Sequence, residues 1–410
     1  MKKVISLLTV MALVIGMTAG CATPAPEPPP AAPAAPAAPA APAAPEVTPA
    51  AAGSGFDTIK LAFIHVGDPA DMGYTYRQHR GTTDMMLQFG ITSDQVLNFF
   101  NIVPGAAVDT AILEAIEWGA DMIFGTSFGF GPNMLEAARE FPDTQFFHAT
   151  GDLALANDLP NFHNYFGNMS QARYLSGIAA GLRTESNILG FVAAHPFAEV
   201  ITGFTAFYKG ALSVNPDVTM YVMYMNAWNN PALEAQIAQA LIDRGADVLG
   251  QHADSPATQT TAQANGVWSV GYNSNMIPAA PNAVLVSPMF DWSVYLTFAV
   301  EAFVNGRDIP TDFLAGMDEG MVFLSALNPS PDIVAEGTEE AIAAAEAEIR
   351  AGRNIFTGPI YAGVGDAGSA VDGGPFAPGE QILAAGETFN NEWRSAPSWN
   401  HIVQGITVIE

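Results

Sequence analysis

The chain has 410 residues, of which 49% are hydrophobic and 13% are charged, and its formal net charge at pH 7 is −27. This apolar fraction excludes an acidic disordered chain, because it is large enough to fill a hydrophobic core. Only 14 Lys and Arg stand against 41 acidic residues, which argues against a nucleic-acid-binding protein, since such a protein must neutralise phosphates.

The N-terminal segment 1–21 has the features of a lipoprotein signal peptide. Lys2 and Lys3 supply positive charge, the run 4–15 is apolar, and small residues precede Cys21, the only cysteine. We predict that Cys21 is lipidated after export and anchors the protein to the cell membrane on its periplasmic or cell-surface side. The alternative is an ordinary secretory signal followed by an incidental cysteine.

The segment 22–56 consists mostly of Pro and Ala. Frequent Pro prevents a helix and favours the extended polyproline conformation. We therefore predict a semi-rigid linker between the anchor and a folded part.

From residue 58 onward, short apolar runs alternate with amphipathic segments. Strands are predicted at 60–66, 96–103, 121–124, 144–148, 188–193, 219–225, 247–250 and 268–272. Helices are predicted at 73–89, 106–118, 133–141, 171–182, 197–214, 231–244 and 258–265. This alternation predicts an α/β protein with parallel sheets covered by helices on both faces.

An internal echo indicates two similar halves. The segment 117–123, in which a helix ends at Gly and a strand follows, is matched by 243–249. Polar loops at 125–128 and 251–256 come directly after the paired strands. Parallel sheets bind ligands at the carboxyl ends of their strands, so we expect these loops to face each other across one cleft.

Several motifs resemble those of the basic membrane protein family, the substrate-binding lipoproteins of ABC importers that are related to purine-nucleoside receptors. They lie in family order at 71–76, 126–130, 173–177, 195–201, 215–217 and 251–256, and the similarity runs from about residue 60 to 359. The resemblance implies a two-lobed type I periplasmic-binding-protein fold, each lobe a Rossmann-like parallel sheet flanked by helices, with about three crossings between the lobes.

We expect the N-terminal lobe to comprise 57–168 plus 290–317, and the C-terminal lobe 169–289 plus 318–410. The crossings at 168–170, 287–290 and 317–320 are the expected hinges about which the lobes close on a ligand.

Aromatic residues dominate the expected cleft loops. They are Tyr74, Tyr76, Phe128, Trp228 and Trp292. A flat heteroaromatic ligand stacks on such rings, each contact contributing on the order of 1–3 kcal/mol. The alternative for any single ring is that it caps the hydrophobic core.

Polar residues in the same loops would orient the ligand. Asp254 accepts hydrogen bonds, and Asn226 and Asn275 both donate and accept, which suits a purine edge. His195 and Glu199 belong to another of the family motifs. Glu199 has a second interpretation, as a charge that stabilises a helix N-terminus.

We find no pattern of an enzyme. His252, Asp254 and Ser255 are too close in sequence for a catalytic triad, and no Gly-x-Ser-x-Gly motif occurs. The histidines show no metal-ligand spacing, so we expect neither a metal nor a cofactor.

These observations predict a monomeric, membrane-anchored receptor that captures a purine nucleoside or nucleobase and delivers it to an ABC permease and its ATPase. The alternatives are the same fold with a flavin or a sugar-like ligand, and a surface lipoprotein that acts as a sensor without transport.

Overall fold

The computed structural model describes residues 55–365, 376–389 and 394–409. The predicted signal peptide 1–21, its Cys21 and nearly all of the linker 22–56 lie outside these residues. So do residues 366–375, 390–393 and 410. No helix of the described residues is long and apolar enough to cross a membrane.

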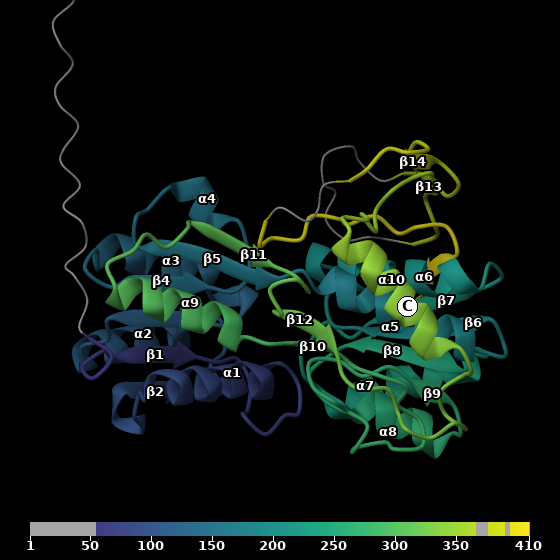
Figure 1. Cartoon of the computed structure of the whole chain (residues 1–410), viewed down its shortest axis with the longest axis horizontal. Coiled ribbons are helices and arrows are strands. Elements are labelled where there is room, and N and C mark those ends of the chain that lie inside the picture. Colours follow the sequence, from purple (N-terminus) through teal and green to yellow (C-terminus); the bar gives the residue numbers. More distant parts are fainter. Residues whose placement is uncertain (1–54, 366–375, 390–393, 410) are drawn as a thin grey trace, which may run out of the picture. The chain divides into compact units, whose positions relative to one another are not determined.

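The first lobe is built on a six-stranded sheet of order β11-β5-β4-β3-β1-β2, in which neighbouring strands pair in parallel (Figure 1). Its strands are β1 (Leu61–Ile64), β2 (Val96–Phe99), β3 (Met122–Gly125), β4 (Gln145–His148), β5 (Phe162–Gly167) and β11 (Asp312–Ala315). Its helices are α1 (Tyr74–Phe89), α2 (Ala106–Trp118), α3 (Gly131–Glu140), α4 (Leu153–Asn157) and α9 (Ser293–Val304). Short 3₁₀ turns occupy Ser93–Gln95 and Phe128–Phe130.

The second lobe is built on a five-stranded parallel sheet of order β15-β7-β6-β8-β9. Its strands are β6 (Ile188–Ala193), β7 (Thr219–Tyr224), β8 (Val248–His252), β9 (Trp268–Ser269) and β15 (Ile406–Val408). Its helices are α5 (Met169–Arg183), α6 (Ala198–Val214), α7 (Pro231–Asp243), α8 (Ala257–Ala264) and α10 (Thr338–Arg350). The predicted fold class is confirmed.

Both sheets repeat one topology, in which the first strand lies between the second and the third. The order β2-β1-β3-β4 corresponds to β7-β6-β8-β9. The echo noted in the sequence falls at equivalent places, since α2 leads into β3 as α7 leads into β8. Gly119 and Gly245 follow these helices with φ of +89° and +94°, a conformation that favours glycine and ends each helix.

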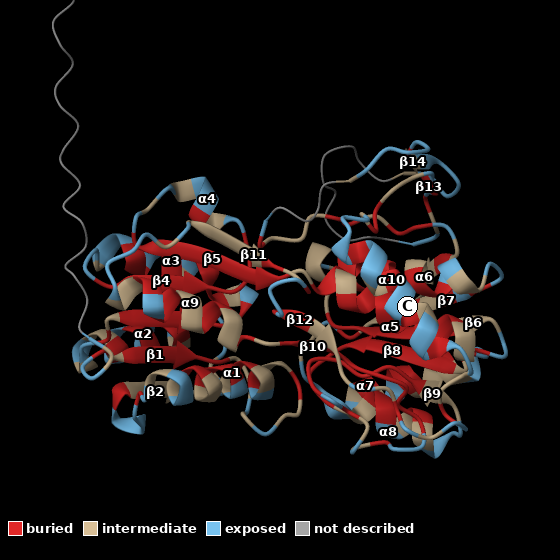
Figure 2. Ribbon diagram, viewed as in Figure 1, coloured by how far each residue is buried: buried red, intermediate tan, exposed pale blue. Residues whose placement is uncertain are grey.

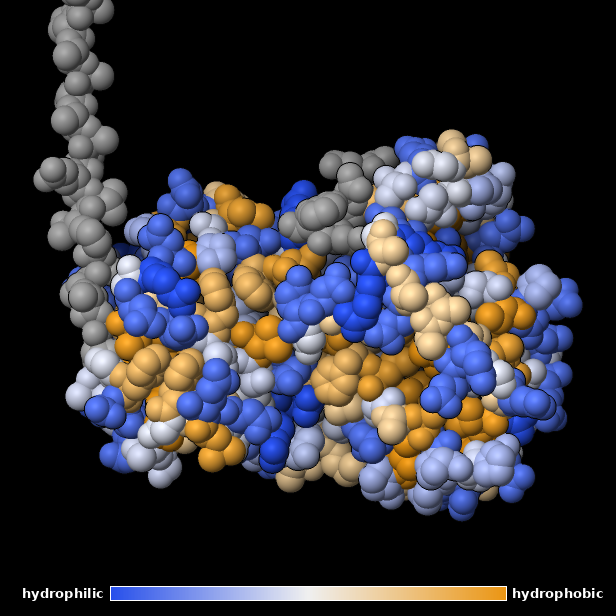
Figure 3. Space-filling model, viewed as in Figure 1, coloured by the Kyte–Doolittle hydropathy of each residue, from blue (hydrophilic) through white to orange (hydrophobic). Residues whose placement is uncertain are grey.

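Burial explains why the central strands are continuously apolar. All four residues of β1 are buried, because helices cover both faces of the sheet, and Figure 2 shows the central strands of both lobes as buried between helices with exposed outer faces. The outer surface of the described residues mixes hydrophilic and hydrophobic side chains over both lobes (Figure 3).

Three connections join the two sheets. The chain leaves the first sheet after β5, returns to α9 after β10 (Pro288–Phe290), and leaves again after β11 to reach β12 (Val322–Leu324). Strands β10 and β12 pair with each other as an antiparallel ribbon, which lies between the two lobes in Figure 1.

The C-terminal segment contacts both lobes. It begins with a small hairpin of β13 (Ile360–Tyr361) and β14 (Gln381–Leu383), and it ends with β15, which extends the second sheet beside β7. Between them, the backbone amide and the hydroxyl of Ser395 donate to the Asp312 carboxylate of the first lobe at 3.0 and 2.5 Å. Thr202 of the second lobe donates to the carbonyl of Trp399 at 3.1 Å. The segment therefore departs from the expectation that 318–410 lies on one lobe.

Candidate functional site

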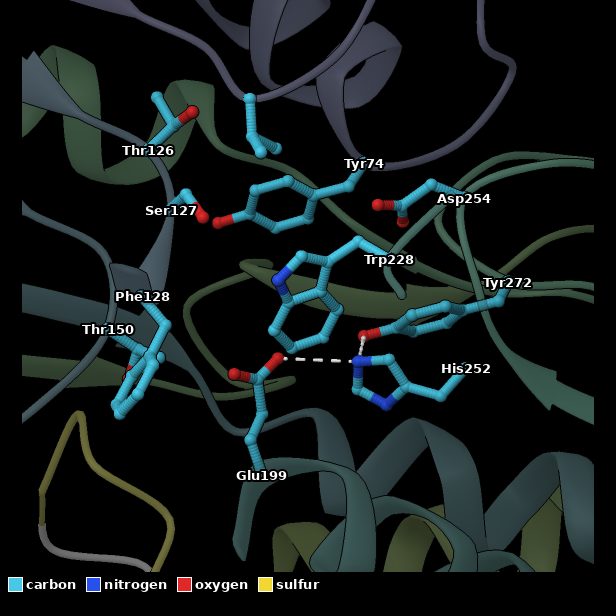
Figure 4. Close-up of a pocket in the computed structure, with 11 residues that line it drawn as sticks. Tyr74, Thr126, Ser127, Phe128, Thr150, Glu199, Trp228, His252, Asp254 and Tyr272 are labelled. Carbon is cyan, nitrogen blue, oxygen red and sulfur yellow. Dashed lines mark hydrogen bonds and ion pairs between the residues drawn. The ribbon is translucent and has the colours of Figure 1, made fainter. Parts of the chain in front are cut away.

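A cavity lies between the two lobes at the carboxyl ends of their strands (Figure 4). It encloses about 360 Å³ of empty space, including the part open to solvent. The first lobe contributes Val66, Tyr74, Thr126, Ser127, Phe128 and Thr150, and the second contributes Glu199, Trp228, His252, Asp254 and Tyr272. Apart from His252, the last residue of β8, each of these follows the carboxyl end of a strand, which is the edge where open α/β sheets bind ligands.

The lobes touch each other around this cavity. The hydroxyl of Ser274 in the second lobe donates to the carbonyl of Met72 in the first. Gly73 lies directly on the backbone of Asp254, where a Cβ atom would come within 2.5 Å of the Asp254 carbonyl oxygen. The rings of Phe128 and Phe197, one from each lobe, have centroids 5.3 Å apart.

Asp71 positions the ring of Tyr74 in the first lobe. Its carboxylate accepts hydrogen bonds from the amides of Gly73, Thr75 and Tyr76 at 2.7, 3.2 and 3.0 Å. These are amides at the start of α1 that have no partner within the helix. The carboxylate thereby holds the first turn of α1, and with it the ring of Tyr74, against the cavity.

The carboxyl group of Asp254 is the central polar group of the second lobe. It is 5% exposed, and the side-chain amide of Asn273 donates to its Oδ1 at 3.2 Å. Burial raises the pKa of Asp254 well above its usual value, and the nearby carboxylates of Asp71 and Glu234 add to this shift. An N–H group of a ligand would satisfy this carboxyl group.

Glu199 and His252 form a pair at the base of the cavity. Glu199 Oε1 lies 3.4 Å from His252 Nε2, and the hydroxyl of Tyr272 lies 3.5 Å from the same nitrogen (Figure 4). Burial lowers the pKa of His252, and Glu199 opposes this shift. Glu199 lies in the first turn of α6 and also lines the cavity, so its position is compatible with either interpretation.

Five of the ten residues predicted for the site line the cavity together. They are Tyr74, Phe128, Glu199, Trp228 and Asp254.

The expectation that Trp292 faces the cleft is wrong. Trp292 is fully buried in the hydrophobic core immediately before α9. Its ring stacks on Phe290 at 4.5 Å and meets the edge of Tyr74 at 5.6 Å. The chain enters α9 here rather than forming a polar loop, so Trp292 supports Tyr74 from behind.

The other four predicted residues do not line the cavity. His195 packs its ring 4.8 Å from that of Trp228. Tyr76 is 39% exposed. Asn226 is exposed in a left-handed conformation, with φ of +55°. Asn275 is exposed and accepts a hydrogen bond from the Ile277 amide at 3.1 Å. The two asparagines shape loops.

Sequence reasoning missed several residues that line the cavity. They are Val66, Thr126, Ser127, Thr150, His252 and Tyr272. Two of the loops were recognised as cleft loops, but their small polar residues were passed over in favour of rings and carboxylates. Taking every residue at or just after a strand end would have found all six. Among the described residues, no group of three or more His, Cys, Asp or Glu side chains is arranged to hold a metal ion.

Comparison with known proteins identifies the family. The family model of PnrA-like ABC transporter substrate-binding proteins, Bmp, matches residues 58–352. The chain belongs to this family. Its members are extracytoplasmic solute-binding proteins rather than enzymes, which confirms the resemblance noted in the sequence and the expectation that the protein is not an enzyme.

Individual relatives agree with this assignment. A purine-binding protein of Brucella abortus (strain 2308) is 34% identical over 74% of this chain and 85% of its own length. A putative ABC transporter glucose-binding protein of Haloferax volcanii is 31% identical over 78% of this chain and 80% of its own. A solute-binding protein of an ABC transporter from Conexibacter woesei has a similar fold, with a TM-score of 0.57 at 20% identity over 72% of this chain and 97% of its own.

Proposed function

We propose that the protein captures a purine nucleobase or nucleoside in the interlobe cavity and delivers it to an ABC permease driven by an ATPase. The observation that carries the proposal is that Tyr74 of one lobe and Trp228 of the other line the same cavity as two buried or half-buried carboxyl groups. Aromatic rings stack on any flat heterocycle, whereas carboxyl groups select its N–H edge.

The purine-binding relative from Brucella abortus favours this ligand class, because the similarity covers most of both chains. Binding would proceed by closure of the lobes about the three connections at 168–170, 287–290 and 317–320. The lobes in this proposal are 57–168 plus 290–317, and 169–289 plus the remainder, with the C-terminal segment reaching across.

A sugar is the second candidate ligand, because the relative from Haloferax volcanii is described as a putative glucose-binding protein. A sugar would use the carboxyl groups as acceptors for its hydroxyls. It would gain less from the rings, since it has no π face to stack.

The two candidates separate in a ligand screen by thermal shift and isothermal titration calorimetry. The panel contains adenine, guanine, hypoxanthine, their nucleosides, glucose and riboflavin. The proposal expects the purines to raise the melting temperature and glucose and riboflavin to leave it unchanged. Binding of glucose alone would establish the second candidate, and no binding by any member would favour a sensor role.

We also propose that the protein is a monomer held to the membrane by lipid on Cys21. Replacing Cys21 by Ser removes the acylated thiol, so the variant should move from the membrane fraction to the soluble fraction of exported protein. A variant that stays with the membrane would contradict the lipid anchor.

A further inference from the structure

One buried cation lies next to the ligand cavity with part of its hydrogen-bonding capacity unused. Arg173, on α5, is fully buried, and its Nη1 donates to the carbonyl of Gln251 at 2.7 Å. Its guanidinium lies over the face of Tyr272, with Cζ 3.6 Å from the ring centroid. The side chain of Tyr272 also helps to satisfy the guanidinium, but the Nε and Nη2 groups have no hydrogen-bond partner among the described residues.

These two groups form one edge of the guanidinium. Nε–H and Nη2–H point in the same direction and make a planar fork, which suits two acceptor atoms side by side. Donors left unpaired in the interior are costly. Arg173 forms no ion pair within 4.0 Å in the described part of the chain, and burial lowers its pKa only to about 10, so it stays charged at neutral pH.

The space beside this fork is open because α6 carries a glycine there. A Cβ atom at Gly203 would lie 3.6 Å from Arg173 Nε and 3.6 Å from His252 Nδ1. Arg173 and Gly203 line a second, inner cavity, and Arg394 and Pro397 of the C-terminal segment line it as well. These last two residues lie outside the part of the chain that the family model matches.

The inner cavity adjoins the ligand cavity. Glu199, His252 and Tyr272 line both, and Figure 4 shows these three side chains together at one side of the ligand cavity. A flat ligand that stacks near Trp228 would therefore present one edge past this trio toward the fork of Arg173.

The acceptor pattern of purines then decides which of them fits. Guanine and hypoxanthine carry two neighbouring acceptors, O6 and N7, the pair that Arg recognises in guanine, whereas adenine carries the N7 acceptor beside an N6 donor. At the next position of the ring, N1–H of a 6-oxopurine is a donor for the carboxylate of Glu199, whereas N1 of adenine is an acceptor that the carboxylate repels.

We propose that Arg173 selects the ligand: its Nε–H and Nη2–H groups donate to the O6 and N7 edge of a 6-oxopurine, so that the receptor prefers guanine and hypoxanthine over adenine. The inference rests on the proposed function, because it requires a purine in the cavity.

The test is titration calorimetry of the whole protein with guanine, hypoxanthine and adenine. We expect both oxopurines to bind at least ~10-fold more tightly than adenine. Arg173→Lys keeps the charge but lacks the fork, so it should reduce this preference to within about twofold. Arg183→Lys is the matched control, because Arg183 also lies on α5 and stacks on a ring, that of Trp268 at 3.4 Å, but lines neither cavity.

Gly203→Ala keeps the test decisive if Arg173→Lys does not fold. The added methyl would lie at ordinary contact distance and favours helix, so this variant should fold. The methyl group covers the space beside Nε. It should therefore weaken the binding of guanine and leave the binding of adenine unchanged.

Two results would overturn the inference while the proposed function stands. One is equal or tighter binding of adenine by the wild type. The other is inorganic phosphate binding that Arg173→Lys abolishes without a change in purine preference, which would make the inner cavity an anion site. Failure of all purines to bind would instead overturn the proposed function.

Discussion

The two walls of the ligand cavity differ in chemistry although the two sheets share a topology. The wall of the first lobe consists of rings, hydroxyls and one aliphatic side chain, and Tyr74 is its only ionisable residue. The wall of the second lobe carries Glu199, His252 and Asp254. Duplicated scaffolds therefore do not imply duplicated roles. We infer that the second lobe selects the ligand and that the first lobe covers it.

The largest expected effect comes from the acidic wall. Asp254→Asn keeps the shape but replaces a carboxyl group by an amide, so it removes an acceptor for a ligand N–H group. Losing such a hydrogen bond costs about 1.5–3 kcal/mol, and we expect the dissociation constant to rise roughly 10- to 100-fold. Isothermal titration calorimetry measures the dissociation constant.

The same substitution should not destabilise the protein without ligand. Because burial raises the pKa of Asp254, the charged carboxylate disfavours the folded state at neutral pH. Asn removes that penalty, so the melting temperature should stay equal or rise. A large drop in melting temperature would mean that Asp254 is a structural residue.

Closure of the first lobe depends on Gly73. A methyl at Gly73 would overlap the backbone of Asp254, with Cβ 2.5 Å from its carbonyl oxygen. Overpacking of this kind costs about 1–3 kcal/mol, so Gly73→Ala should hold the lobes apart and weaken binding about tenfold. Small-angle scattering with saturating ligand should show a larger radius of gyration than for the wild type. A normal radius with normal affinity would contradict the closed arrangement.

The rings of Trp228 and Phe128 should contribute unequally to ligand binding. Trp228→Ala removes a half-buried ring and should weaken binding about tenfold, within the ~1–3 kcal/mol of one stacking contact. Phe128 is 47% exposed at the mouth of the cavity, so Phe128→Ala should have a smaller effect. Tyr76→Ala, outside the cavity, is the control that should leave the affinity unchanged. A larger effect of Phe128→Ala would reverse the roles assigned to the two walls.

The last expected effect concerns stability rather than binding. Glu234 on α7 is fully buried, and Ser255 donates to its Oε2 at 2.7 Å. Burial raises the pKa of Glu234 from 4.5 to about 7. Between these pH values the folded protein keeps a proton that the unfolded chain has released. The free energy of unfolding therefore falls as the pH rises, by about 3 kcal/mol in total.

Glu234→Gln removes this contribution. The difference in unfolding free energy between variant and wild type should grow from pH 5 to pH 7.5 and then stay constant in denaturant titrations. Glu114→Gln, at an exposed carboxylate on α2, is the control and should give a flat difference. A flat difference for Glu234→Gln would show that its carboxyl group titrates normally.

Local patterns were enough to predict most of the scaffold. The predicted ranges for α2 and β6 coincide with the observed elements, and the other predicted strands and helices shift by a few residues. Elements that were not predicted include β5, α9 and α10. Five of ten predicted site residues line the cavity, because strand ends can be located from sequence whereas the direction of a side chain cannot.

The sequence by itself determined the α/β class, the repeated helix-to-strand junctions at Gly119 and Gly245, and the loops that form the cleft. These features depend on residues within one or two turns of each other. The tertiary structure alone decided that Trp228 lines the cavity while Trp292 is buried, that Arg173 and Glu199 line the same inner cavity, and that Ser395 binds the opposite lobe. Each of these depends on contacts between segments far apart in the chain, and no local pattern encodes which of them meet.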